Sequence, residues 1–199
     1  MSISYNKKFV DKVLRIEKDE QVFDGETIKR RFLLEIKLKN KENENSVAVI
    51  MMNPSEADEE KSDRTINKVV KYVFNNDKTK GYGRILIMNL FVAYKTKPEG
   101  VNKLIAKSDF DYVVGNKDSI ISNNEYILNA TKESELTIIA WGKGSITRYR
   151  ERSNAVLKLL PYDKLHCVKS LTKEGYPRHP RNWSHGWELI TYDQALKNF

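Results

Sequence analysis

An unbroken apolar run from Val47 to Met52 stops abruptly at Asn53-Pro54-Ser55, and this junction constrains the fold more than any other segment. A strand that is apolar at every position is typical of a sheet centre that is buried on both faces. Pro54 has no backbone donor and biases the residue before it toward an extended conformation, so we expect the strand to end there. Asn53 is therefore predicted to lie at the carboxyl end of a central strand, where open α/β sheets bind ligands.

Three later apolar segments repeat this arrangement, each ending in polar residues or glycine. They are residues 84–89, 135–141 and 164–169. Stretches with helical periodicity separate the segments, which predicts parallel strands joined by right-handed crossovers, with helices on both faces of the sheet. Residues 29–39 alternate apolar and charged side chains, so we expect a half-exposed strand that pairs antiparallel with the strand at Val47. The apolar pattern of residues 1–24 fits either a helix or a strand.

The predicted fold class is α/β, a three-layer α/β/α sandwich with a central mostly parallel sheet of about four strands plus an N-terminal antiparallel strand. A length of 199 residues suits one domain, so residues 1–199 are expected to form a single domain. Helices are expected at four places, with Asp63 as the N-cap of the first and His185 helping to start the last. Those places are from about Arg64, over residues 109–129, around residues 155–160 and from about Gly186.

The composition narrows the class of protein and its compartment. No apolar run is long enough to span a membrane, and the first residues lack the apolar core of a signal peptide. The single cysteine, Cys167, excludes an internal disulfide and suits a cytoplasmic protein. A formal charge of +8 is compatible with binding to nucleic acid without requiring it. The oligomeric state is not indicated by the sequence.

The chemistry is expected where the parallel strands end, because their carboxyl ends meet at one edge of the sheet. That edge would present the carboxamides of Asn53 and Asn89, the Ser55 hydroxyl, the amide beside Gly142 and, from the last long loop, His179. Such a set suits recognition of a polar planar ring or the positioning of a water molecule. We find no nucleophile elbow, P-loop, dinucleotide fingerprint or His/Cys metal spacing, so no metal or cofactor is predicted. Asp58 and Asp63 are candidates to bind a divalent cation, although helix capping is the favoured role for Asp63.

The order of these motifs carries a resemblance. Met-Met-Asn-Pro-Ser, then Ile-Met-Asn-Leu, then Ile-Ala-Trp-Gly and a late His-Pro follow the order seen in the uracil-DNA glycosylase superfamily. A fuller pattern adds Asp-Arg-Thr, Asn-Leu-Phe and Gly-Tyr-Pro-Arg-His-Pro. Over roughly Arg31 to Trp183 it resembles a bacterial and phage family catalogued as domain of unknown function 1643.

The glycosylase resemblance implies roles for individual residues. Asn53 matches the position that orients the attacking water, Asn89 the carboxamide that reads the base edge, and His179 the group that stabilises the departing base. The full predicted substrate-binding set is Pro54, Ser55, Asn89, Phe91, Trp141 and Gly142. The residues predicted to contact a nucleic-acid backbone are Lys143, Arg178, Arg181 and Trp183. Where the glycosylases carry a Ser-containing wedge after His-Pro, this chain has Arg181-Asn182-Trp183, so Trp183 is the candidate to wedge or stack.

Simpler interpretations stay open beside these. Asn53 and Asn89 can tie loops together, His179 can be a loop histidine, Trp141 can pack in the core, and the basic residues from position 143 to 181 can form a solvated face. The leading hypothesis is a base-recognising domain that acts on DNA or a nucleotide, with metal-independent hydrolysis of an N-glycosidic bond. The alternatives are a catalytically silent DNA- or nucleotide-binding module, such as one used in phage–host conflict, and an enzyme acting on free nucleotides or nucleosides.

Overall fold

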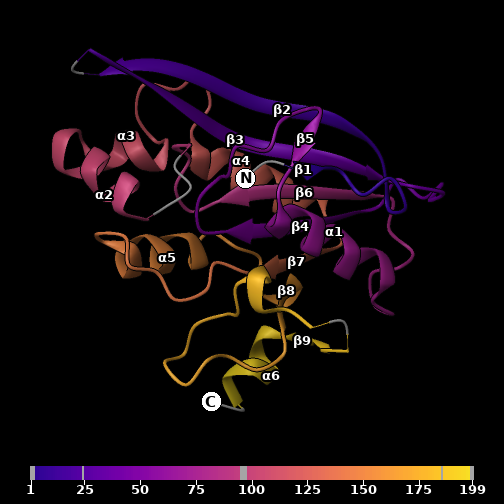
Figure 1. The fold of residues 1–199 in the computed structure, drawn as a ribbon. Helices are drawn as coiled ribbons and strands as arrows, with labels where there is room; N and C mark the ends of the chain where they lie inside the picture. The colour runs from indigo at the N-terminus through magenta and orange to yellow at the C-terminus, as the bar shows by residue number, and fades with distance from the viewer. Residues whose placement is uncertain (1–2, 24, 95–97, 185, 198–199) are drawn as a thin grey trace.

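A seven-stranded sheet forms the centre of the computed structural model, which describes residues 3–23, 25–94, 98–184 and 186–197 (Figure 1). The strand order across the sheet is β2-β3-β6-β4-β7-β8-β9. The strands are β2 (Val10–Phe23), β3 (Glu26–Leu38), β4 (Ser46–Met51), β6 (Arg84–Asn89), β7 (Leu136–Ile139), β8 (Leu165–Val168) and β9 (Leu189–Thr191). A second, two-stranded sheet pairs β1 (Ile3–Ser4) antiparallel with β5 (Lys61–Ser62).

The apolar run that organises the sequence is β4, and it lies between two parallel neighbours. β4 pairs with β6 on one side, where Met51 is opposite Asn89, and with β7 on the other, where Ile50 is opposite Ile139. β8 continues the parallel set beyond β7. The prediction that the strands ending near Asn53, Asn89 and Trp141 are adjacent and parallel is confirmed.

The sheet as a whole is mixed rather than mostly parallel, because β2, β3 and β9 join it antiparallel. The N-terminal part, left open between helix and strand, contributes the long strand β2, which pairs with β3 over its length with three register shifts. β9 also replaces the start of the helix expected from Gly186. The last helix, α6 (Tyr192–Lys197), begins later, and His185 lies outside the described residues.

The expected pairing of residues 29–39 with β4 is wrong. β3 pairs with β6 instead, with Leu34 opposite Ile87. Both edges of β4 are occupied by parallel partners, so the chain after β3 passes over the start of β6 before entering β4. Gly83 permits this passage, because a Cβ there would lie 1.7 Å from the carbonyl oxygen of Asn43.

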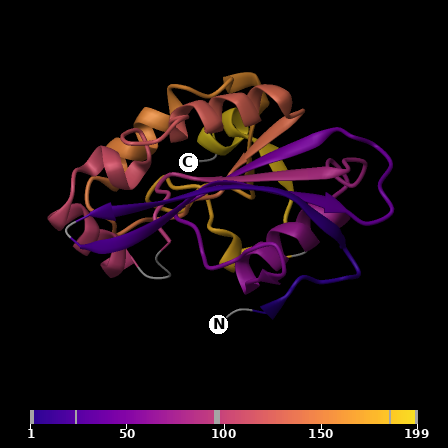
Figure 2. The ribbon, with the colours of Figure 1, turned by 90° about the horizontal axis from the view of Figure 1, so that it is seen from above.

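Helices cover both faces of the sheet (Figure 2). α1 (Arg64–Asn75) packs on one face, where Ile66 and Val69 meet Val47 and Val49 of β4 in one apolar cluster. The other face is covered by α2 (Pro98–Lys107), α3 (Phe110–Val114), α4 (Asn123–Glu133), α5 (Tyr149–Leu157) and α6. Alternate residues of β4 supply the two cores, which explains why the whole strand is apolar.

The helix predicted over residues 109–129 is two helices. Gly115 ends α3 in the left-handed conformation, with a φ of 80°, and a Cβ on it would lie within 2.8 Å of both Phe32 and Val92. Ser122 then starts α4 with a capping box that includes Glu125. No described helix has the length and apolar character needed to cross a membrane.

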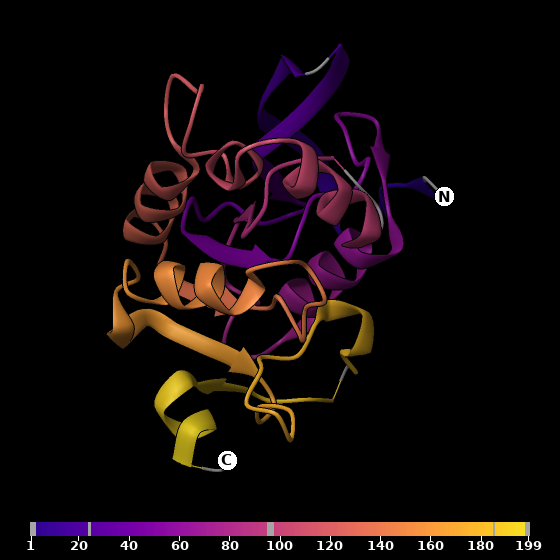
Figure 3. The ribbon, with the colours of Figure 1, turned by 90° about the vertical axis from the view of Figure 1, so that its left-hand side faces the viewer.

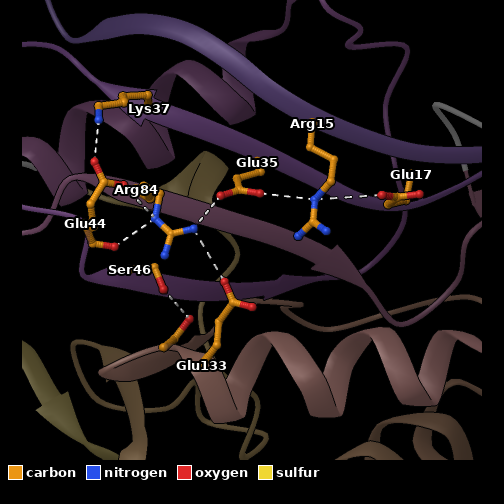
Figure 4. Close-up of polar contacts among 9 residues, drawn as sticks. Arg15, Glu17, Glu35, Lys37, Glu44, Ser46, Arg84 and Glu133 are labelled. Carbon is orange, nitrogen blue, oxygen red and sulfur yellow. Dashed lines mark hydrogen bonds and ion pairs between the residues drawn. The ribbon is translucent and has the colours of Figure 1, made fainter.

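The amino-terminal end of the parallel strands is tied by ion pairs (Figure 4). Arg84 at the start of β6 contacts Glu35 at 2.7 Å, and Glu44 and Glu133 at 3.6 Å each. Arg15 contacts the second oxygen of Glu35 at 3.2 Å. These pairs join β2, β3, β6 and α4 at the edge opposite to the strand ends.

Candidate functional site

A cavity of about 700 Å³ lies at the carboxyl ends of β4 and β7. In Figure 1 the arrowheads of β4 and β6 point to the left, and Figure 3 shows the molecule from that side. Three regions far apart in the sequence meet there, within residues 51–65, 142–145 and 172–182. The lining residues are Met51, Met52, Asn53, Pro54, Ser55, Asp63, Arg64, Thr65, Gly142, Lys143, Ser145, Thr172, Arg178, His179, Arg181 and Asn182.

The Asn53-Pro54-Ser55 turn forms one wall of this cavity. It follows directly on β4, so the fully buried strand fixes its position. Pro54 is buried, and the Asn53 amide nitrogen lies 3.4 Å from the Pro54 carbonyl oxygen. The Ser55 hydroxyl is buried with no hydrogen-bond partner among the described residues. The turn therefore brings a carboxamide and an unsatisfied hydroxyl to the cavity.

His179 lines the opposite wall in a defined tautomer. The backbone N–H of Arg181 donates to its Nδ1 at 3.1 Å. Burial, aided by the positive charge of Arg181, lowers the pKa of His179 to about 4. At neutral pH the ring is therefore uncharged, and because Nδ1 accepts a hydrogen bond the proton is on Nε2. His179 can donate one hydrogen bond from Nε2 without carrying a charge.

Gly142 makes the approach of the His179 loop possible. Its φ is 71°, and a Cβ would lie 2.7 Å from the Cβ of His179. The Tyr149 hydroxyl donates to the Gly142 carbonyl and holds this end of β7. The glycine predicted as a substrate contact thus has a structural reason, since a side chain there would push His179 away.

The start of α1 also lines the cavity with Asp63, Arg64 and Thr65, whereas the sequence suggested only a helix cap or a cation ligand for Asp63. Asp63 caps the helix as predicted, its Oδ1 accepting from the backbone N–H groups of Thr65 at 2.5 Å and Ile66 at 2.9 Å. Its Oδ2 is buried and has no partner in the part of the chain that the structure describes. The signal was present, because a helix that follows a parallel strand begins at that strand's carboxyl end.

Three cationic side chains are exposed around the cavity, those of Arg64, Lys143 and Arg181. Lys143 also lies 3.3 Å from the Glu174 carboxylate. Arg178 lines the cavity but its guanidinium is engaged, donating to the carbonyl oxygens of Ser170 at 2.9 Å and Leu171 at 3.3 Å. Arg178 therefore shapes the loop that carries His179.

Three other basic residues of the expected backbone track are engaged within the protein. Arg148 pairs with Glu151, and Arg150 donates to the Tyr176 hydroxyl at 3.0 Å. Arg152 is buried, and its Nε donates to the Leu90 carbonyl at 2.8 Å. Burial lowers the pKa of Arg152 to about 10. These three arginines are therefore less available to contact a nucleic-acid backbone than the exposed Arg64 and Arg181 at the cavity.

Four residues predicted for the site are not among those that line the cavity, namely Asn89, Phe91, Trp141 and Trp183. Phe91 and Trp141 lie in the core, Phe91 edge-on to the ring of Phe110 at 6.2 Å. Trp183 is 6% exposed, and its Nε1 donates to the Arg178 carbonyl at 2.9 Å. A wedge role would require this ring to leave its packing against Tyr72.

Asn89 ends β6, which neighbours β4 on the side away from β7. It is fully buried, opposite Met51 in the register, and it follows Ile85 and Ile87 on the α1 face of the sheet. Both polar atoms of its side chain lack a partner among the described residues, whereas its carbonyl accepts from Asn123 at 3.0 Å. The structure thus brings Asn53 and His179 to one cavity, whereas Asn89 lies beside Met51 on the neighbouring strand and outside the lining.

Within the described ranges, no group of three or more histidine, cysteine, aspartate or glutamate side chains is arranged to hold a metal ion. Asp58 turns its carboxylate toward the backbone N–H groups of Glu60 at 2.9 Å and Lys61 at 2.6 Å.

A family model for a protein of unknown function, DUF1643, matches residues 31–181, well over half of the chain. The chain belongs to the DUF1643 family. Apart from Asn182, every residue that lines the cavity falls within the DUF1643 match. The resemblance read from the sequence motifs is thereby confirmed for this family.

Solved structures similar to this DUF1643 chain include an esterase mutant and a thermostable esterase from Pseudomonas putida. Each is 12% identical, with a TM-score of 0.23, over 71% of this chain and 48% of the esterase chain. The chain therefore spans about half the length of these esterases, and a TM-score this low carries no argument about fold or function. No curated protein gives a significant match.

Proposed function

We propose that the cavity binds a nucleotide or a nucleic-acid base, with the base directed inward and the phosphate at the opening. The observation that carries this proposal is the pairing of a neutral polar interior with a cationic opening. Asn53, Ser55 and uncharged His179 supply donors and acceptors suited to a base, and Arg64 and Arg181 are exposed around them. A volume of about 700 Å³ is within the ordinary range of small-ligand sites.

The reaction that these residues support best is metal-independent hydrolysis of an N-glycosidic bond, on a uracil-DNA glycosylase-like fold. Asn53 would orient the attacking water. The Nε2–H of neutral His179 would donate to the base oxygen on which negative charge develops as the base departs. The arrangement of the Asn-Pro-Ser turn, the β7 glycine and the His-Pro loop around one cavity supports this proposal. Asn89 is fully buried beside Met51, so it would read the base edge only if ligand binding uncovers it.

A second candidate is binding of a free nucleotide, by an enzyme or by a catalytically silent module. Two observations favour a ligand of that size over a long nucleic acid. Arg148, Arg150 and Arg152 are engaged within the protein, and Trp183 is buried. The single cysteine, Cys167, is buried and reduced, which fits the cytoplasmic location that we propose.

Two measurements on the whole protein test the proposal. Calorimetric titration with the deoxynucleoside 5′-monophosphates should detect binding that is weakened in Asn53→Leu. A screen of base release from oligonucleotides, each carrying one modified base, should identify a substrate. His179→Gln should lower release by about 10²–10³-fold while changing nucleotide binding little.

The control is Arg148→Gln, which changes a cation outside the cavity lining and should leave both readouts unchanged. Nucleotide binding without base release would establish the binding module. If neither mononucleotides nor oligonucleotides bind, the proposed function is wrong.

A further inference from the structure

A cavity lies at each end of α1. The first residues of the helix, Arg64 and Thr65, line the cavity of the candidate site, and residues 75–78 at the other end line a second cavity of about 730 Å³. The helix has 12 residues, so its axis is about 18 Å long. Only a ligand longer than a mononucleotide can reach both cavities.

A row of exposed cations runs along α1 between the two cavities. Arg64, Lys68 and Lys71 are four and three residues apart, which places them on one face of the helix. Lys78 follows in the lining of the second cavity. None of the four forms an ion pair with a carboxylate of the described residues. Lys68 donates to the carbonyl oxygen of Arg181 at 2.6 Å, a neutral partner that leaves the charge uncompensated.

Helix stability does not explain this row. Like charges three and four residues apart destabilise a helix, and α1 contains no aspartate or glutamate that could pair with them. The phosphates of a strand that lies along the helix would replace this repulsion with attraction. The row is therefore suited to a nucleic-acid backbone.

Trp187 offers an aromatic surface in the second cavity. Its ring is partly exposed, whereas Trp141 and Trp183 are buried. The Nζ of exposed Lys169 lies 4.6 Å from the centre of the Trp187 ring, a cation–π contact that is weak at the surface, so a base can displace it. Arg178, which lines the first cavity, has its guanidinium carbon 5.4 Å from the same ring. Bases of any identity stack on aromatic rings of this kind.

The charges of the second cavity favour a base over a phosphate. Lys78 and Lys197 line it together with Asp77 and Glu188, so the two signs of charge balance. Asp77 is also paired with Lys80 at 2.7 Å. A cavity without excess charge suits an uncharged ring, whereas the row along α1 suits phosphates.

We propose that the two cavities hold two bases of one single-stranded nucleic acid, whose backbone lies along α1. The inference deepens the proposed function and rests on it for the base in the first cavity. Phosphates contact Lys68, Lys71 and Lys78 in addition to the cations of the first cavity, and an unpaired base stacks on Trp187. This path lies on the face of the sheet opposite to α5, so the internal contacts of the α5 arginines do not obstruct it.

Titration of the whole protein with oligothymidylates, followed by tryptophan fluorescence, distinguishes a strand from a nucleotide. Because Trp141 and Trp183 are buried, quenching by a stacked base reports on Trp187. A strand of about eight nucleotides should quench the fluorescence, and should bind about 10–100-fold more tightly than thymidine 5′-monophosphate and more tightly than the same strand in a duplex. The slope of log K against log salt should be steeper for this strand than for a dinucleotide by about 2, from three further phosphate contacts.

Lys71→Gln is the sharpest charge variant, because Lys71 is exposed and lies outside the lining of both cavities. It should reduce the slope for the longer strand by about 0.7 and leave mononucleotide binding unchanged. The matched control is Lys132→Gln, which removes an exposed cation from α4 on the other face of the sheet and should change neither quantity.

Trp187 is tested by two substitutions. Trp187→Leu should lower the affinity for the longer strand by about 5–100-fold, and Trp187→Phe should retain most of it because it keeps an aromatic ring. Mononucleotide binding should be the same in both variants as in the wild type. Equal affinities of the Leu and Phe variants for the strand would show that no base stacks at this position.

The outcomes separate this inference from the proposed function. If the longer strand binds no more tightly than the mononucleotide, or if Lys71→Gln leaves its salt slope unchanged, the strand path is wrong while the nucleotide site stands. Strand binding that depends on Lys71 and Trp187 without mononucleotide binding would mean that the proposed base site in the first cavity is wrong while the path along α1 is right. Binding to vesicles of phosphatidylserine and phosphatidylcholine in place of oligonucleotides would overturn the inference.

Discussion

The contact between Gly142 and His179 shows how one residue without a side chain sets the geometry of the cavity. The loop that carries His179 reaches the end of β7 only because no Cβ intervenes. The same loop is held by the Arg178 guanidinium and by the hydrogen bond from Trp183. Residues predicted to contact a ligand thus act partly by placing one another.

Gly142→Ala should displace the loop that carries both His179 and Arg181, and should weaken nucleotide binding through the displaced Arg181 cation. It should also destabilise the fold by about 1–3 kcal/mol, because it combines a positive φ with a close contact. Gly25→Ala is the matched control, since Gly25 also has a positive φ of 74° but nothing lies within 4 Å of the added Cβ. Urea denaturation and calorimetric titration measure the two effects. Equal losses of stability in both variants would show that the backbone conformation, and not the contact with His179, is responsible.

His179 should make stability depend on pH in acid. Its pKa is about 4 in the folded chain against an ordinary 6.5, so the unfolded chain takes up the proton first as the pH falls. The contribution to stability is complete above about pH 6.5 and is lost as the pH falls to about 4, at most about 2–3 kcal/mol. Urea denaturation at pH 7 and pH 4.5 should show a smaller loss in His179→Gln than in the wild type. His166, whose pKa burial also lowers, is present in both proteins and cancels in the comparison.

Asn89→Leu separates a ligand contact from a structural one. A buried amide with two unpartnered atoms costs about 1–3 kcal/mol, so a leucine of similar size should raise the free energy of unfolding. It should also reduce the discrimination between bases if ligand binding uncovers Asn89. A lower free energy of unfolding would indicate that ordered water satisfies the amide.

At the scale of elements, the sequence predicted the central parallel strands but not their neighbours. Periodicity identifies β4, β6, β7 and β8 because each is apolar and ends in a turn signal. It cannot show which strand β3 joins, since the alternating pattern of β3 fits beside β4 and beside β6 equally well. The same limit applies to the site. The sequence predicted correctly where the parallel strands end. The face on which Asn89 lies and the burial of Trp183 depend instead on tertiary packing.

Gly83→Ala tests the passage of the chain from β3 to β4. The added Cβ would lie 1.7 Å from a backbone oxygen of Asn43, and backbone yields less readily than a flexible side chain. We expect a loss of about 1–3 kcal/mol or more in the free energy of unfolding. Gly81→Ala, with nothing within 4 Å of its added Cβ, should change stability little. An unaffected Gly83→Ala would mean that residues 39–45 take another path.

For the whole molecule, the formal charge of +8 matters less than where the cations lie. Many of the basic side chains form ion pairs or hydrogen bonds on the surface, and Lys143 at the cavity is one of them through Glu174. Arg64, Lys143 and Arg181 are nevertheless exposed together around one cavity. A basic composition alone therefore could not distinguish a nucleotide site from a track for long nucleic acid.

Salt dependence measures how many of these cations contact phosphates. With three contacts, the slope of log K against log salt for a short single-stranded oligonucleotide should be about −2, or roughly −0.7 per contact. Arg181→Gln should reduce the slope by about 0.7, and Arg148→Gln should not change it. A slope that is the same in wild type and Arg181→Gln would place the phosphates elsewhere.

The cavity draws its walls from residues between Met51 and Asn182, so it does not exist until nearly the whole chain is in place. Each half of the protein supplies only part of the lining, because the Asn-Pro-Ser turn follows β4 and the His-Pro loop follows β8, the last parallel strand in the chain. A ligand held there binds only the completed fold, and its binding energy adds to the free energy of global unfolding. Ligand binding should therefore slow amide hydrogen exchange in the sheet core as well as at the cavity, since opening the site by releasing β8 disrupts the core on both faces.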